Sequence, residues 1–127
     1  MNRLSFFYPF HFPEEISHLS QSAPRKITQH GNQIRLELLT SESSRKKITP
    51  LLLTLKNKSE TPLESNERGV EKFVFVLSGN VTLQIDGNDF ALKTEETLYF
   101  DASLPHKISN ASPETARILI TVSPSKI

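Results

Sequence analysis

The sequence contains no cysteine. This absence excludes disulfide bonds, cysteine-ligated zinc and a cysteine nucleophile, so any metal site would have to use histidine and carboxylate ligands. It is also compatible with a cytoplasmic location, which is our expectation. No apolar run approaches the roughly 20 residues that cross a bilayer. The formal net charge of +1 is nearly even, so we expect neither a membrane nor direct contact with nucleic acid.

The length and composition of the chain predict one soluble globular domain. Its 127 residues can bury a hydrophobic core but are too few for two domains of ordinary size. Hydrophobic residues make up 36% of the chain and charged residues 23%, a balance that argues against widespread disorder. We divide the chain into an N-terminal arm at residues 1–30 and a β-barrel at residues 31–127.

The predicted arm is rich in aromatic residues. Five of them stand within seven positions: Phe6, Phe7, Tyr8, Phe10 and Phe12. Such a cluster is expected to leave water, either by packing on its own barrel or by lying across a partner subunit. A short helix from Pro13 to Gln21 is predicted after it, because proline suits the first helical position and two glutamates follow in the first turn.

From Lys26 onward, short apolar segments separated by turn residues predict about nine strands and an all-β domain. Alternating apolar and polar residues mark strands at residues 33–39, 81–85 and 116–122, and a further strand is predicted at residues 50–56. The continuous apolar run at 73–77 predicts a strand that is covered on both faces. Residues 57–69 are polar and predict a long loop. A closed barrel is favoured over an open sheet, because closure removes exposed strand edges.

Two segments carry a family resemblance: VEKFVFVLSGNVTLQIDG at residues 70–87 and FALKTEETLYFDASLPHKISN at residues 90–110. They resemble the two characteristic motifs of the cupin superfamily, and most of all those of the small cupin domains at the C-terminus of helix-turn-helix transcriptional regulators. The likeness covers about Gln33 to Pro124. It implies a double-stranded β-helix, or jelly-roll, barrel, and a homodimer.

The first of these motifs departs from the pattern of metal-binding cupins, which place two histidines and a glutamate there. Counting back from the glycine of the first turn puts Lys72 at the glutamate position. The histidine positions fall on Asn66 and Arg68, or on Ser65 and Glu67 with the longer spacing. A cation between Arg68 and Lys72 would be repelled.

The second motif keeps its histidine ligand, His106, with Asn110 four residues later. One histidine cannot hold a divalent ion, because catalytic metal sites use about three protein ligands. We therefore predict that the protein uses no metal or other cofactor. The alternative is a poor site in which Glu67 or Glu71 turns inward to join His106.

Strand alternation predicts an anion site in the mouth of the barrel, where Arg68, Lys72 and His106 would lie above an apolar floor. The residues predicted to bind a ligand are Asn66, Arg68, Lys72, Tyr99, His106 and Asn110. Two simpler interpretations stay open. Arg68 and Lys72 can extend to solvent, and His106 can be a barrel histidine that is hydrogen-bonded to the backbone.

The sequence thus favours a metal-free module that binds a small molecule, with an organic anion as the favoured class, in a ligand-binding or regulatory role. Only about 30 residues precede the barrel, too few for a DNA-reading helical domain, so such a module would lack its own. The alternative is a small cupin enzyme, isomerase-like or dioxygenase-like, with a degenerate metal site. In that case His106 is the candidate catalytic residue, acting as a general base.

Overall fold

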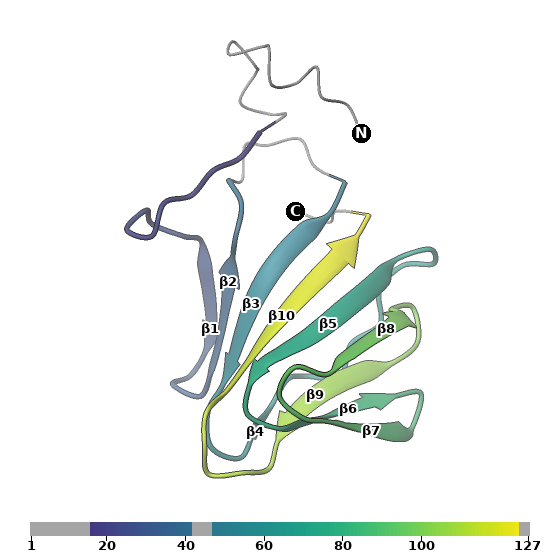
Figure 1. Cartoon of the computed structure of the whole chain (residues 1–127). Coiled ribbons are helices and arrows are strands. Elements are labelled where there is room, and N and C mark those ends of the chain that lie inside the picture. The colour runs from purple at the N-terminus through teal and green to yellow at the C-terminus, as the bar shows by residue number, and fades with distance from the viewer. Residues whose placement is uncertain (1–15, 42–46, 125–127) are drawn as a thin grey trace.

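The computed structural model describes residues 16–41 and 47–124, and the regular structure in them is entirely antiparallel β-sheet. The larger of two sheets has six strands in the order β1-β2-β3-β10-β5-β8 (Figure 1). Its strands are β1 (Ile27–His30), β2 (Ile34–Leu38), β3 (Thr49–Leu55), β5 (Glu71–Ser78), β8 (Thr97–Asp101) and β10 (Ala116–Ser123). No helix in the described part of the chain is long and apolar enough to cross a membrane.

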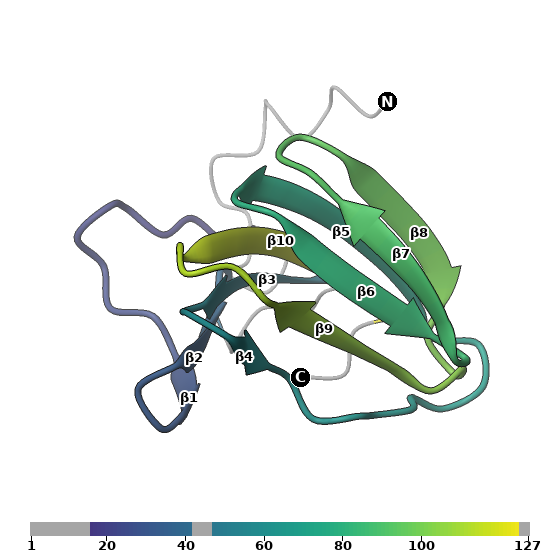
Figure 2. The ribbon, with the colours of Figure 1, turned by 90° about the horizontal axis from the view of Figure 1, so that it is seen from below.

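The smaller sheet has four strands in the order β4-β9-β6-β7. They are β4 (Ser59–Glu60), β6 (Val81–Ile85), β7 (Asn88–Leu92) and β9 (His106–Asn110). Figure 2 shows this sheet lying over part of the larger one, with β6 and β7 in front of β5 and β8. The described residues therefore form the all-β jelly-roll that the sequence predicts.

The hydrophobic core lies between the two sheets. On β5 and β10 every second side chain is buried, as strand geometry requires when one face packs inward. Both sheets contribute fully buried residues, including Val76 and Ile118 from the larger sheet and Leu83 from the smaller. The inward row of each strand thereby fixes which polar residues also face the interior.

Gly79 shows why the turn between β5 and β6 needs glycine. Its φ is +89°, a backbone conformation that L side chains rarely adopt. A Cβ atom at this position would lie 2.9 Å from the Cα of Ala116 at the start of β10. This close approach leaves no room for a side chain where the chain leaves β5 beside β10.

Three expectations from the sequence are corrected by the fold. Residues 16–21, the described part of the predicted helix Pro13–Gln21, contain no helix, whereas residues 13–15 and the aromatic cluster lie outside the described residues. The apolar run at 73–77 is covered on one face only, because Phe73 and Leu77 point outward and are 40% and 39% exposed. The predicted loop at 57–69 includes the short strand β4.

Candidate functional site

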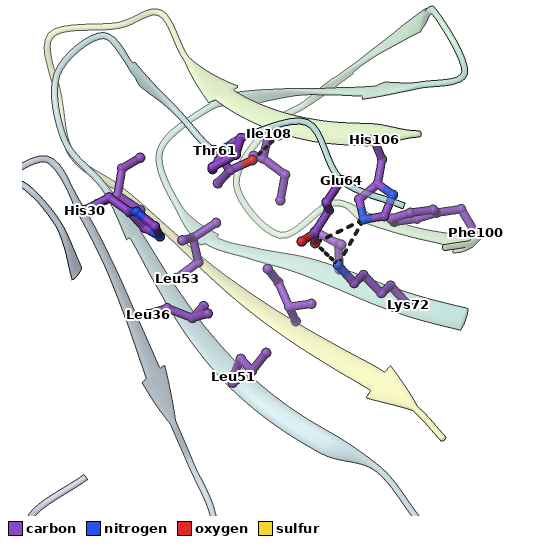
Figure 3. A pocket seen from close by; sticks show the side chains of 14 residues that line it. His30, Leu36, Leu51, Leu53, Thr61, Glu64, Lys72, Phe100, His106 and Ile108 are labelled. Carbon is purple, nitrogen blue, oxygen red and sulfur yellow. Dashed lines mark hydrogen bonds and ion pairs between the residues drawn. The ribbon is translucent and has the colours of Figure 1, made fainter. Parts of the chain in front are cut away.

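A cavity of about 350 Å³ opens between the two sheets. Its lining is mainly aliphatic, with a few polar side chains among the apolar ones (Figure 3). The apolar lining comprises Ile34, Leu36, Leu51, Leu53, Pro62, Val74, Phe100, Ile108 and Ile120, and the polar lining comprises His30, Thr61, Glu64, Lys72 and His106. In Figure 3, Glu64, Lys72 and His106 point toward one another at one end, and His30 lies at the other. Cavities of this size and character are the usual form of small-molecule sites.

Strand parity brings two of the predicted residues into this cavity. Lys72 shares the inward face of β5 with Val74 and Val76, and His106 shares the inward face of β9 with Ile108. Lys72 is 9% exposed and His106 is 3% exposed. These are the placements that strand alternation predicts. Because Lys72 is buried, the alternative interpretation in which it extends to solvent is wrong.

Glu64 is the third member of this group, and it comes from the segment that the sequence predicts as a loop. The backbone fixes it, because Glu64 N–H donates to the His106 carbonyl at 3.0 Å and His106 N–H donates to the Glu64 carbonyl at 2.9 Å. Three residues earlier, the Thr61 side-chain oxygen accepts a hydrogen bond from Ile108 N–H at 2.9 Å. The segment is thus attached along β9, and no pattern in the sequence predicted this pairing.

The three side chains form one hydrogen-bonded group, which we call the Lys-Glu-His triad: Lys72, Glu64 and His106. Lys72 Nζ lies 2.5 Å from Glu64 Oε2 and 2.9 Å from His106 Nε2, and His106 Nε2 lies 3.3 Å from the same carboxylate oxygen. His106 Nδ1 lies 2.7 Å from the Leu104 carbonyl oxygen. A carbonyl oxygen can only accept, so Nδ1 carries a proton, and Nε2 of a neutral imidazole accepts from the Lys72 ammonium.

The environment of Glu64 keeps its carboxylate ionised. A hydrogen bond with His106, which Nε2 can donate only when the imidazole is protonated, is the largest cause that lowers the pKa of Glu64 from 4.5 to about 2. Contact with the Lys72 ammonium lowers it further, against the opposing effect of partial burial. The Glu64 side chain is 54% exposed, whereas that of Lys72 is 11% exposed. Glu64 therefore stands where the triad meets solvent, and it balances the charge of a buried ammonium.

The triad does not suit the metal ion that the cupin family commonly holds. Lys72 Nζ occupies the point on which Glu64 Oε2 and His106 Nε2 converge, and an ammonium repels a cation. Glu71, one of the alternative ligands, lies on the outward face of β5, and Glu67 is exposed. Among the described residues, no three histidine or carboxylate side chains gather closely enough to bind a metal.

Three of the predicted ligand-binding residues lie away from the cavity. Arg68 is exposed and acts on Asp101, whose pKa is lowered by hydrogen bonds from Ser103 and, less strongly, by Arg68. Asn66 is half-buried outside the cavity lining. Tyr99 is 62% exposed on the outward face of β8, where a hydrogen bond with Glu71 raises its pKa. Its neighbour Phe100, which was expected to line the barrel together with Tyr99, does line the cavity.

Asn110 does face the interior, as predicted, but its polar atoms serve the fold. Its side-chain N–H groups donate to the carbonyl oxygens of Leu55 at 3.0 Å and Glu114 at 2.6 Å, with a longer contact to Lys56 at 3.4 Å. Its side-chain oxygen accepts from the backbone N–H of Ser112 at 3.0 Å and from its hydroxyl at 2.9 Å. These contacts join β3 and the loop before β10, so Asn110 is a structural residue.

Comparison with known proteins places this architecture. The model of the cupin domain family matches residues 51–122, more than half of the chain. Polyketide synthase CurC of Streptomyces cyaneus is 32% identical over 54 residues, which are 42% of this chain and 35% of that protein. The chain thus matches only about a third of the length of this curated relative.

Solved structures share the fold at low sequence identity. The cupin domain of an XRE family transcriptional regulator from Enterobacter cloacae is 20% identical with a TM-score of 0.69, over 75% of this chain and 100% of that one. A predicted oxalate decarboxylase from Thermotoga maritima is 18% identical with a TM-score of 0.72, over 85% of this chain and 100% of that one. At such identities the likeness establishes the fold alone. Together with the family match, it shows that this chain belongs to the cupin domain family.

Proposed function

We propose that this cupin is a metal-free module that binds a small, mainly apolar organic molecule in its barrel cavity, with one polar group placed against the Lys-Glu-His triad. The observation that supports this most is a cavity of about 350 Å³ whose aliphatic lining ends at a buried lysine. An apolar pocket with a few convergent polar groups is the usual form of a ligand site.

The triad also indicates which polar group the ligand presents. An ammonium has three N–H donors, and contacts with Glu64 and His106 use two of them, so one can point to a ligand. The second carboxylate oxygen of Glu64 can accept a hydrogen bond. Because Glu64 already balances Lys72, a ligand carboxylate would have to compete with it. A hydroxyl or carbonyl group therefore suits the site better than the organic anion that the sequence favoured.

A sensor role is the proposed use of this binding. The fold is shared with the cupin domain of an XRE family transcriptional regulator, in line with the resemblance that the sequence carries. A ligand that replaces water in the cavity would stabilise the two sheets against each other, and a partner protein can read such a change. The homodimer and the cytoplasmic location expected from the sequence remain predictions.

Thermal-shift and calorimetric titrations with 1-hexanol and hexanoate test the binding proposal. We expect 1-hexanol to raise the melting temperature, since a ligand at about 100 times its Kd adds about 2.7 kcal/mol of stability. Hexanoate should bind more weakly at neutral pH. Lys72→Met should weaken 1-hexanol binding about ten-fold, because a hydrogen bond from a charged donor is lost.

Two further variants separate the cavity from the surface. Leu51→Phe fills the cavity and should abolish binding of 1-hexanol. Lys93→Met, at an exposed position just after β7, should leave the Kd unchanged. If 1-hexanol gave no shift, or gave the same shift in Leu51→Phe as in the native chain, the cavity would not be the binding site and the proposal would fail.

A further inference from the structure

We propose that Lys72 captures carbonyl ligands covalently, by forming an iminium with an apolar aldehyde or ketone held in the cavity. This inference rests on the proposed binding function and assigns a chemistry to the same site. Among the described residues that line the cavity, Lys72 is the one with a primary amine, and its side chain is 11% exposed. The Nζ atom lies at one end of a mainly aliphatic cavity (Figure 3), where an apolar aldehyde bound in the cavity would bring its carbonyl carbon next to the nitrogen.

The triad supplies a proton acceptor for the amine. Only a neutral amine has the lone pair that attacks a carbonyl, so a lysine used in this way needs a base beside it. His106 Nε2 lies 2.9 Å from Lys72 Nζ, and its lone pair faces the amine because Nδ1–H is committed to the Leu104 carbonyl. When the amine reacts, its proton can pass to His106 Nε2, which lies within hydrogen-bond distance.

Proton transfer within the triad leaves its net charge unchanged. With the proton on Lys72, the ammonium donates to Glu64 at 2.5 Å and to His106 at 2.9 Å. With the proton on His106, the imidazolium faces the same Glu64 oxygen at 3.3 Å. Glu64 therefore has a positive partner in both arrangements, so the transfer leaves no unpaired charge on the buried Lys72 or His106.

The reaction balances with these three residues and the ligand alone. Lys72 passes one proton to His106, and the nitrogen attacks the carbonyl carbon while the C=O π pair moves to oxygen. A second proton passes from nitrogen to that oxygen, a transfer that the Glu64 carboxylate can relay. His106 then returns its proton to the hydroxyl, which leaves as water, and the nitrogen lone pair forms the C=N bond. An ammonium and an aldehyde thus give an iminium and water, and the iminium keeps Glu64 as its counter-ion.

Reductive trapping tests the inference with hexanal and sodium cyanoborohydride at neutral pH, followed by intact and peptide mass spectrometry. The expected product carries one hexyl group on Lys72. Exposed Lys58 and Lys93 serve as internal references. A nearly buried lysine would ordinarily be labelled less than an exposed one. We nevertheless expect about ten-fold more label on Lys72 than on either reference, because the cavity concentrates the aldehyde beside its nitrogen.

Matched variants identify the parts of the triad. Lys72→Arg keeps the positive charge and should lose the hexyl label, while Lys93→Arg should not affect labelling of Lys72. His106→Gln keeps an acceptor for the Lys72 N–H but cannot take its proton, so the initial rate of labelling should fall on the order of a hundred-fold. Binding of 1-hexanol to His106→Gln, measured in parallel, confirms that the cavity is intact.

The result that overturns the inference is label confined to exposed lysines, with Lys72 unmodified, in a protein that binds 1-hexanol in the same cavity. That result would leave the proposed binding function standing. If neither 1-hexanol nor hexanal engaged the cavity, the proposed function and this inference would fail together.

Discussion

His106 and Asn110 lie four residues apart on the same face of strand β9, and both are at most 3% exposed. The side chain of Asn110 bonds to the carbonyl oxygens of Leu55 and Glu114 and to the backbone N–H and hydroxyl of Ser112. The side chain of His106 contacts the backbone only through Nδ1, and its Nε2 points toward Lys72 and Glu64 at the cavity. Backbone partners cannot be exchanged without unfolding, whereas side-chain partners can rearrange around a ligand. Burial on a shared face therefore does not by itself distinguish structure from function.

The largest expected effect comes from breaking the structural end of β9. Asn110→Ala should destabilise the fold by about 3 kcal/mol, because it leaves the buried carbonyl groups of Leu55 and Glu114 without their donor. Urea unfolding gives this value. A loss of less than about 0.5 kcal/mol in the free energy of unfolding, as expected for an ordinary surface substitution, would contradict the structural role of Asn110.

The next largest effect is expected when the His106 end of β9 is converted into a metal site. Lys72→Glu removes the ammonium from the point where Glu64 Oε2 and His106 Nε2 converge and adds a third ligand. The variant should be less stable than the native chain in a chelator, because two carboxylates then repel. It should gain about 2 kcal/mol with Zn²⁺ in excess. Calorimetry on Lys72→Glu and on Lys72→Glu with His106→Gln measures this, and equal Zn²⁺ binding by both would refute the geometry.

A smaller effect concerns the acid dependence of stability. The pKa of Glu64 is lowered from 4.5 to about 2 in the folded chain, so its contribution is fully present above pH 4.5 and is lost as the pH falls toward 2. Its side chain is about half exposed, so we discount this contribution to about 1 kcal/mol. Glu64→Gln should be less stable than the native chain at neutral pH, with the difference vanishing near pH 2. A constant difference across that range would contradict the assignment.

The smallest effect is expected on the outer surface. Tyr99 was predicted to bind ligand, but it lies on the outward face of β8. Tyr99→Phe should therefore change the Kd for 1-hexanol by less than about two-fold, within the usual range for a surface site. Titration of both proteins with 1-hexanol checks this. A ten-fold loss of affinity would return Tyr99 to the site.

Alternation in the sequence predicted the inward placement of Lys72 and His106, because side-chain direction in a strand follows from parity once one buried residue is known. Parity was not applied to Tyr99 and Phe100, which were both expected to line the barrel although adjacent residues of a strand point to opposite faces. The prediction that the strand at 73–77 is covered on both faces was wrong for another reason. A hydrophobic side chain suits a covered face but does not require one, and Phe73 is 40% exposed.

The remaining part of the site depends on tertiary contacts that leave no local pattern. Glu64 reaches Lys72 because its segment runs along β9, where β4 pairs with the end of that strand and Glu64 forms an isolated bridge with His106, more than forty positions away in the sequence. Nothing in a polar segment with one leucine distinguishes that pairing from an ordinary solvent-exposed loop. The predicted anion site therefore lacked its own counter-ion, and the balance of charge in the cavity was misjudged.

The chemistry proposed for the cavity depends on His106 being held by Leu104 so that Nε2 offers its lone pair to Lys72. Long-range ¹H–¹⁵N NMR of the histidine side chains, assigned with His106→Gln, tests it directly at neutral pH. We predict a protonated Nδ1 and an unprotonated Nε2 for His106, with the Nε2 resonance shifting in Lys72→Met. A proton on Nε2 with an unprotonated Nδ1 would contradict the claim, because Lys72 would then have no acceptor on the histidine.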